Sequence, residues 1–167
     1  MLISGPAYLA PQVLNWITGS IYGTNWKYIE VLWPWVVVFI PLSFLFAKEL
    51  NVQSLGEATA IGLGSRLHRS RMVLLFYSVA LAGAAVGVAG MISFIGLLAP
   101  HMARRIVGNS YKLLIPLSAV LGAVILLLAD LAGRMLFQPL DIPAGVFTAG
   151  VGAPFFMYLL FKRRSLG

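Results

Sequence analysis

The sequence contains no cysteine, only two histidines and few charged residues. Without cysteine the chain can form neither disulfides nor thiolate metal sites, and two histidines are too few for a metal cluster. Charged residues make up 10% of its 167 positions, whereas hydrophobic residues make up 60%. A soluble domain of this length could not bury so much apolar surface, so the natural solvent of the chain is a lipid bilayer.

Sequence motifs for bond-making chemistry are also absent. Neither the G-x-x-x-x-G-K-[ST] phosphate loop nor the dinucleotide-binding glycine signature occurs, so the chain is expected neither to hydrolyse ATP nor to bind a nucleotide cofactor. Ser65 and His68 lie in a polar loop beside arginines, without the buried acid that a serine hydrolase needs. The sequence therefore predicts no enzyme, no catalytic residue, no cofactor and no metal site.

The net charge of +7 could suggest a nucleic-acid partner, but the basic residues lie in clusters between apolar runs. This is the positive-inside pattern of membrane proteins. It predicts an all-α, polytopic membrane helix bundle with a cytoplasmic C-terminus and no nucleic-acid partner. Residues 1–29 are interrupted by glycine and proline and are expected to form an outer-face segment. About five membrane-crossing segments are predicted at 31–47, 72–92, 96–107, 113–137 and 143–161.

The third of these segments is too short for an ordinary span. Arginines at both ends of 72–103 indicate the cytoplasm, so the chain must return within residues 93–103. Eleven residues cover only about 16 Å as a helix, against a hydrocarbon core of about 30 Å. We expect a short broken helix at 96–107, containing Pro100 and buried inside protein. His101 would lie near its middle, as a hydrogen-bonded structural residue rather than a ligand.

Small residues recur at helical spacing on two of the predicted spans. They predict close packing against another helix. Pro154 should kink the last span near Gly150. The glycines concerned are Gly83, Gly87 and Gly90 in the first case, and Gly145 and Gly152 in the second.

Asp130 and Arg134 are four residues apart with the acid first, which favours an ion pair on one helix face. Both lie toward the outer end of 113–137, where the cost of a charge falls and Arg134 can reach the interface. A structural ion pair is the simpler interpretation, and a role in substrate gating is the alternative.

The stretch from Asn51 to Arg71 is the longest polar-leaning interruption in the chain. Ser54 followed by Glu57 has the spacing of a capping box, and Gly64 offers a left-handed stop, so a short helix is predicted at 54–64. Its many small residues keep it thin, so another protein could approach closely. A docking element is one interpretation, and an ordinary loop with an interfacial helix is the other.

Several stretches taken together resemble the FecCD-type permeases of ABC importers for iron-siderophores, haem and vitamin B12. The matching residues are WITGSIYGTNW at 16–26, SLGEATAIGLG at 54–64, GMISFIGLLAPHMARRIVG at 90–108, LLIPLSAVLGAVILLLADLAGR at 113–134 and DIPAGVFTAGVGAPFFMYLLFKR at 141–163. Five motifs in the family's own order make the resemblance specific. It covers nearly the whole chain but only the C-terminal half of the family's length, so the chain is either a fragment or one half of a split permease.

The resemblance implies a permease subunit that works as one of a pair in the bacterial inner membrane. Its partners would be a second permease subunit, identical or different, two cytoplasmic ABC ATPases and an extracytoplasmic substrate-binding protein. An iron(III)-siderophore would be the cargo. The implied ATPase-coupling residues of the helix at 54–64 are Ser54, Leu55, Gly56, Glu57, Ala58, Ala60, Gly62, Leu63 and Gly64.

Two other classes of membrane protein remain as alternatives. One is half of a secondary transporter or channel that has no ATPase partner, which would line its path with ionisable residues. The other is a purely structural membrane subunit. Co-purification with a soluble ATPase that depends on residues 54–64 would distinguish all three.

Overall fold

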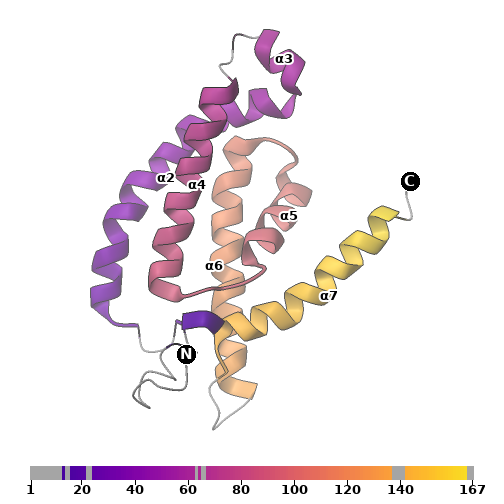
Figure 1. Cartoon of the computed structure of the whole chain (residues 1–167). Coiled ribbons are helices and arrows are strands. Elements are labelled where there is room, and N and C mark those ends of the chain that lie inside the picture. The colour runs from indigo at the N-terminus through magenta and orange to yellow at the C-terminus, as the bar shows by residue number, and fades with distance from the viewer. Residues whose placement is uncertain are drawn as a thin grey trace, which may run out of the picture. The chain divides into compact units, whose positions relative to one another are not determined.

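The computed structural model describes residues 13, 16–21, 24–62, 64, 67–136 and 142–164. After a helical turn at 16–18, all regular structure in this part of the chain is α-helix (Figure 1). The elements are α2 (Trp26–Ser54), α3 (Glu57–Gly62), α4 (Leu67–Ala89), α5 (Ile95–Val107), α6 (Tyr111–Leu136) and α7 (Ala144–Arg164).

Among the described residues, α2, α4 and α6 are long and apolar enough to cross a membrane. The apolar part of α7, Ala144–Tyr158, is shorter. Large apolar side chains are exposed along these helices, as expected of a chain whose surroundings are lipid and other protein rather than water. The predicted all-α membrane class is confirmed.

The predicted short helix also appears in the structure. Residues 90–94 are not helical, and the 13-residue helix α5 follows, with Pro100 inside it. At 1.5 Å per residue α5 is about 20 Å long, too short to cross a hydrocarbon core of about 30 Å. The arithmetic that predicts a broken segment here therefore describes the observed element to within one residue at its start.

The bounds of the two preceding helices differ from the prediction. Helix α2 begins at Trp26, inside the segment expected to be irregular, and continues past Lys48 and Glu49 to Ser54. Helix α4 begins at Leu67 and ends at Ala89, several residues before the predicted limits. Lysine, glutamate and arginine are good helix formers, so polar residues mark where a helix leaves the bilayer without ending it.

The chain forms two compact units, which are described separately. Unit 1 comprises residues 1–23, 89–99 and 122–167, and unit 2 comprises 24–88 and 100–121. Helices α5 and α6 contribute residues to both.

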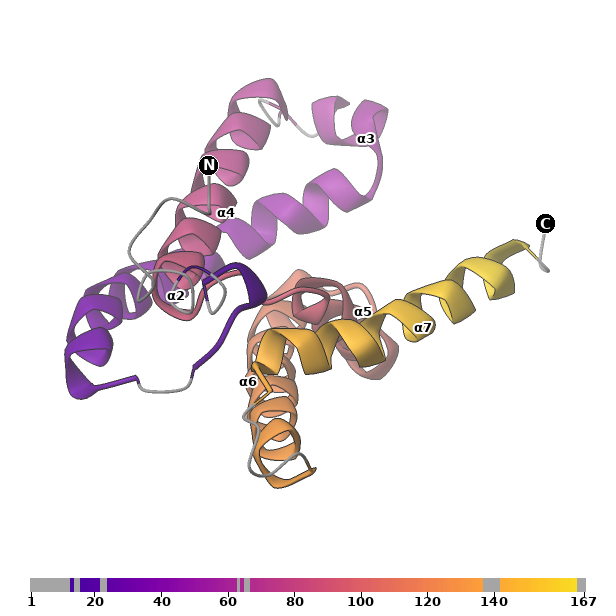
Figure 2. The same ribbon diagram turned by 60° about the horizontal axis from the view of Figure 1, so that its bottom comes forward.

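In unit 2, α2 and α4 lie side by side (Figures 1 and 2) and meet through aromatic rings. The Tyr77 ring lies 5.3 Å from that of Phe39 and 5.2 Å from that of Phe46, and its hydroxyl donates to the Phe39 carbonyl oxygen at 2.5 Å. These helices and the first turns of α6 line a mostly apolar cavity of about 700 Å³. Tyr77 thus supplies both ring contact and a hydrogen bond between α2 and α4.

In unit 1, the segment around residues 16–20 is hydrogen-bonded to two other parts of the chain. Met91 N–H donates to the Trp16 carbonyl oxygen at 3.1 Å, and Ser20 N–H donates to that of Ala89 at 3.0 Å. Gly145 N–H, in the first turn of α7, donates to the carbonyl oxygen of Gly19 at 2.9 Å. Backbone N–H groups thus bond backbone carbonyl oxygens of other segments where the chain is not helical.

Close approach in unit 1 requires glycine at defined positions. A Cβ on Gly145 would collide with the Thr18 carbonyl oxygen, and one on Gly152 with the Phe94 side chain. Gly90 has a φ of +72°, and a Cβ there would lie 2.6 Å from the Trp16 carbonyl oxygen. Gly145 and Gly152 therefore lie in close contacts, with Thr18 and Phe94 respectively. Gly90 follows the end of α4, so it does not share a helical stripe with Gly83 and Gly87 as predicted. Pro154 lies inside α7, and its predicted kink stays a prediction.

The packing predicted for the other stripe stays a prediction, because the described residues leave it open. No described atom lies within 4 Å of the position that a Cβ would take on Gly83 or Gly87. Small residues permit close approach, but they do not specify what approaches. The face of α4 that carries these glycines is consequently open in the described structure.

Substitution by alanine should have different effects at a glycine in a close contact, such as Gly145, and at a glycine that faces open space, such as Gly83. Gly145→Ala should lower the free energy of unfolding by about 1–3 kcal/mol, because the added methyl overlaps the Thr18 carbonyl. Gly83→Ala should leave it unchanged or raise it by up to about 1 kcal/mol, because alanine is the better helix former. Thermal unfolding of the purified protein in detergent, followed by tryptophan fluorescence, measures both. Equal losses in the two variants would contradict the close contact described at Gly145 and the open space described at Gly83.

Candidate functional site

Helix α3 is the short element between two long helices of unit 2, and it lies beyond their ends (Figures 1 and 2). It begins at Glu57, not at Ser54 as predicted, because Ser54 is the last residue of α2. The Ser54 hydroxyl donates to the carbonyl oxygen of Asn51 at 2.7 Å, so it bonds backward into its own helix instead of capping the next one. Leu55 and Gly56 alone separate the two helices.

Two glycines with left-handed backbone bracket α3. Gly56 has a φ of +103°, and Gly64 has a φ of +80° with its N–H bonded to the Ile61 carbonyl oxygen at 2.9 Å. The predicted left-handed stop at Gly64 is thus observed. Leu63, also among the predicted coupling residues, lies outside the described residues.

The exposed surface of α3 and of its link to α2 combines small and apolar residues with Glu57 and Thr59. Ala60 is fully buried, whereas Leu55 and Ile61 are 62% and 58% exposed. No described atom lies within 4 Å of where a Cβ would stand on Gly56, Gly62 or Gly64. Ala58 is also exposed. Such a small apolar patch on a thin element can bind a complementary surface, and its residue types offer no catalytic chemistry.

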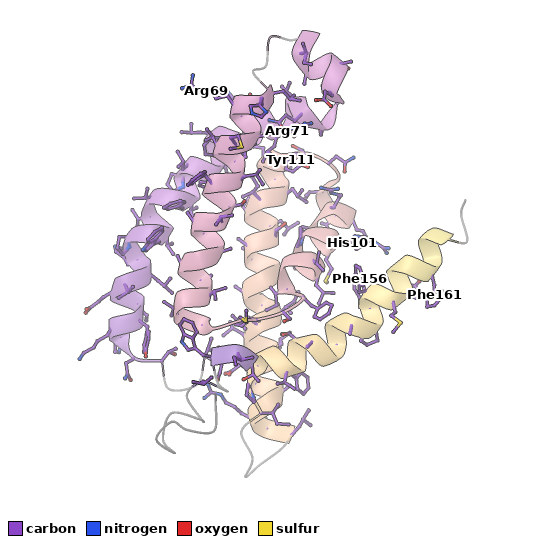
Figure 3. All side chains as sticks on the ribbon, in the orientation of Figure 1. Arg69, Arg71, His101, Tyr111, Phe156 and Phe161 are labelled. Atoms are coloured by element: carbon purple, nitrogen blue, oxygen red, sulfur yellow. The ribbon has the colours of Figure 1, made fainter. Side chains whose placement is uncertain are left out.

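Side chains at the end of α2 and in α3 connect this region to α4. Gln53 Nε2 donates to the Ser70 hydroxyl at 3.0 Å. Arg71 forms an ion pair with Glu57 at 3.4 Å, although both side chains are more than half exposed. Exposed pairs of this kind contribute about 0–1 kcal/mol. Figure 3 shows Arg69 and Arg71 on α4 at the end nearest α3.

A further connection runs from α2 to the start of α6. The Tyr111 N–H donates to Oδ1 of Asn51 at 2.9 Å, across 60 positions of sequence, in a partly buried setting. The Tyr111 ring lies 6.0 Å from the Arg104 guanidinium of α5, and Arg104 Nη2 donates to the Tyr111 hydroxyl at 3.5 Å. Figure 3 places Tyr111 at the same end of unit 2 as Arg71.

Sequence reasoning identified α3 but missed the residues that hold it in place. Asn51, Gln53 and Tyr111 belong to none of the quoted motifs, and each bonds a partner that is distant in sequence. The available signal was weak. Asn51 is an amide in a polar turn at a helix end, which is equally typical of a residue that bonds water.

The predicted intrahelical ion pair is present in unit 1. Arg134 Nε lies 2.8 Å from Asp130 Oδ2 on α6, and the carboxylate side chain is only 17% exposed. Helix α6 is one of the three apolar helices, so lipid rather than water surrounds much of it. Asp130 lies six residues before the end of α6, consistent with the predicted position toward one end of the span.

No group of three or more His, Asp or Glu side chains that could hold a metal ion occurs in the described part of the chain. His101 is half-buried on α5, and His68 lies in the first turn of α4. The described geometry therefore offers a short exposed helix joined to α2 and α4, and an apolar cavity in each unit. The second cavity, in unit 1, has a volume of about 400 Å³ and an almost wholly apolar lining.

Comparison with known proteins matches residues 1–162 to the model of the FecCD transport family. The "Probable siderophore transport system permease protein YfhA" of Bacillus subtilis is 50% identical over 99% of this chain and 48% of its own length. The "Fe(3+)-citrate import system permease protein YfmE" of the same organism is 50% identical over 88% of this chain and 44% of its own length. The "Fe(3+) dicitrate transport system permease protein FecD" of Escherichia coli is 41% identical, over 92% and 50%.

A solved structure is similar as well. It is described as an "inward-facing conformation" of a "metal-chelate type ABC transporter", and it matches 96% of this chain and 53% of its own chain. The TM-score is 0.86 and the identity is 31%. The chain thus spans about half the length of the relatives that it matches.

The two ion pairs should differ in their contribution to stability. Asp130→Asn should lower the free energy of unfolding by about 1–3 kcal/mol, because it leaves Arg134 without its carboxylate in an apolar setting. Glu57→Gln should lower it by less than about 1 kcal/mol, because water solvates both partners of that pair. Thermal unfolding in detergent at low and high salt measures both. A loss at Glu57 as large as that at Asp130 would contradict this assignment.

Proposed function

The chain belongs to the FecCD transport family, and we propose that it forms the C-terminal half of the permease of an ABC importer for iron(III)-siderophores. It provides part of the wall of the translocation path and the contact through which ATPase subunits drive transport. One observation carries this proposal. A family matched by ferric-chelate permeases has here, between two membrane-length helices, a six-residue helix that is largely exposed and carries small and apolar residues, among them Ile61.

Helix α3 is the proposed coupling helix. Its buried residue, Ala60, packs on its own chain, while Leu55 and Ile61 remain free for a partner of complementary shape. Glycine at three positions leaves room for that partner to approach the backbone. The predicted coupling residues from Ser54 to Gly64 therefore retain their proposed role, with Ser54 acting as the end of α2 rather than as a cap.

The proposed partners follow from this role. The sequence has no phosphate loop, so ATP hydrolysis is assigned to two cytoplasmic ATPase subunits that receive the coupling helices. A second permease subunit and the remaining half of this one complete the path. An extracytoplasmic binding protein delivers the cargo. The relatives' names support a ferric chelate as that cargo, and a wrapped chelate requires a shaped apolar and polar path rather than ligands for the bare ion.

The proposed orientation places α3 in the bacterial cytoplasm. Basic residues of unit 2 gather at the α3 end, on the first turn of α4, the last turn of α5 and the start of α6. Cytoplasmic loops carry such an excess of Lys and Arg. The C-terminal Lys162, Arg163 and Arg164 are proposed to lie on the same side of the membrane.

This orientation can be tested directly, because the chain has no native cysteine. Ile61→Cys should react with a membrane-impermeant maleimide only in inverted vesicles, and Trp26→Cys only in right-side-out vesicles. Trp26 is the first residue of α2 and Ile61 lies beyond its last, and the 29 residues of α2 extend about 43 Å. The cysteine-free parent is the control. Labelling of Ile61→Cys from the outside would refute the proposed coupling role.

The coupling role itself predicts a dependence on side-chain size at Gly62. In the assembled full-length transporter, Gly62→Trp should lower chelate uptake per ATP hydrolysed by about tenfold, equivalent to about 1.4 kcal/mol. Gly62→Ala should stay close to the parent. A Cβ at this position meets no described atom of this chain, so we assign the difference between the two variants to a partner.

Uptake of a radiolabelled ferric–citrate or ferric–hydroxamate chelate into proteoliposomes, together with phosphate release, measures this ratio. Retention of ATPase subunits on affinity-purified permease is the second readout. Parent-like coupling and retention in Gly62→Trp would show that no motor contacts this surface.

A further inference from the structure

Two helices of unit 2 are joined end to end by a cap that comes from a distant part of the sequence. The first N–H groups of any helix lack partners within that helix, and side chains next to it in sequence usually satisfy them. At the start of α6 the N–H of Tyr111 is instead bonded to Asn51, in the last turn of α2. The position of one helix end is thereby tied to the other.

The other end of this connection is α3. Leu55 N–H bonds the Val52 carbonyl oxygen at 3.2 Å, and Gly56 N–H bonds that of Gln53 at 3.3 Å. Ala60 N–H then bonds the carbonyl oxygen of Gly56 at 3.0 Å. Hydrogen bonding therefore continues through both residues of the link. We therefore expect a displacement of α3 to be passed to the last turn of α2, where Asn51 lies.

Beyond Asn51, Tyr111 leads to a third helix. Its backbone N–H is held by α2, while its ring and hydroxyl contact Arg104 of α5. The residue thus joins α2, α5 and α6 at one point. By comparison, the Glu57–Arg71 pair that ties α3 to α4 is exposed and screened by water and salt.

We infer that Asn51 is a positioning residue for energy coupling, which transmits displacement of α3 to α5 and α6 through its bond to the Tyr111 N–H. This inference rests on the proposed function, since it assigns the path by which a partner's motion reaches the membrane helices. Asn51 itself contacts neither partner nor cargo in this assignment. Its effect depends on one acceptor oxygen at one place.

The experiment compares three substitutions in the assembled full-length transporter, reconstituted with its ATPases and binding protein. Asn51→Ala removes the acceptor. Asn51→Asp keeps an acceptor oxygen at the same place and adds a negative charge, which a helix N-terminus favours. Asn109→Ala is the matched control, because it deletes the same groups from an exposed position in the turn just before α6.

Asn51→Ala should lower radiolabelled ferric-chelate uptake per ATP hydrolysed by roughly fivefold, at the low end of typical coupling between sites. Its ATPase subunits should remain bound and active, because the α3 surface is unchanged. Asn51→Asp should restore at least half of the parent ratio, and Asn109→Ala should match the parent. If Asn51→Ala acted by a general loss of structure, ATP hydrolysis would fall in that variant. Asn51→Asp would then not restore the ratio of uptake to ATP hydrolysed.

A parent-like ratio in Asn51→Ala would overturn the inference and leave the proposed function standing. An Asn51→Asp variant as uncoupled as Asn51→Ala would also overturn it, since the acceptor would then not be the cause. If Asn51→Ala does not assemble, Asn51→Ser replaces it, because its shorter side chain withdraws the oxygen while remaining polar, and the same ratios decide. Failure of the parent transporter to take up chelate on ATP addition would refute the proposed function itself.

Discussion

A bilayer offers the polypeptide backbone no hydrogen-bond partner, and this constraint explains most of the described structure. Three long helices satisfy their own N–H and C=O groups, but the chain also breaks its helices at residues 19–20 and 90–94. At these breaks the N–H groups of Ser20 and Met91 bond carbonyl oxygens of other segments, and so does that of Gly145 at the start of α7. The backbones can approach this closely because Gly19, Gly90 and Gly145 carry no Cβ. These three glycines of unit 1 are therefore needed for hydrogen bonds between backbone segments and not only for packing.

The same requirement acts at the ends of helices, where the partner need not come from nearby sequence. Ser110 is the residue just before α6, but an N-cap side chain bonds the second or third N–H of its helix. Asn51 supplies the bond to the first N–H of α6. A cap from a neighbouring residue would stabilise α6 alone. A cap from α2 also holds the end of α2 close to the start of α6. The Asn51 side chain therefore both bonds the first N–H of α6 and links the two helices.

Features that depend on residues close in sequence, or on the number of residues available to cross the membrane, could be predicted from the sequence. The length available between Arg71 and Arg104 predicts α5 almost to the residue, and the spacing of Asp130 and Arg134 predicts their ion pair. Ser54 misled because a serine three residues before a glutamate fits both a cap and the last turn of a longer helix, and the longer helix α2 prevails. Glycine spacing indicates a thin face but not its occupant, so the faces at Gly152 and Gly83 look alike in sequence and differ in the structure. The Asn51–Tyr111 bond spans 60 positions and leaves no local pattern to detect.

Helix α3 is too short to be an independent body. Six residues form fewer than two turns, and nucleation makes isolated helices below about 12 residues marginal in water. Its conformation must therefore be imposed by its attachments, namely buried Ala60, the bonded link to α2 and the turn at Gly64. A partner that grips the exposed Leu55 and Ile61 cannot move α3 without moving these attachments, whereas a longer helix on a flexible loop could absorb the same motion locally. The shortness of α3 and its hydrogen-bonded link to α2 are thus two parts of one physical arrangement, and the proposed coupling role needs both if force applied to α3 is to reach the membrane helices.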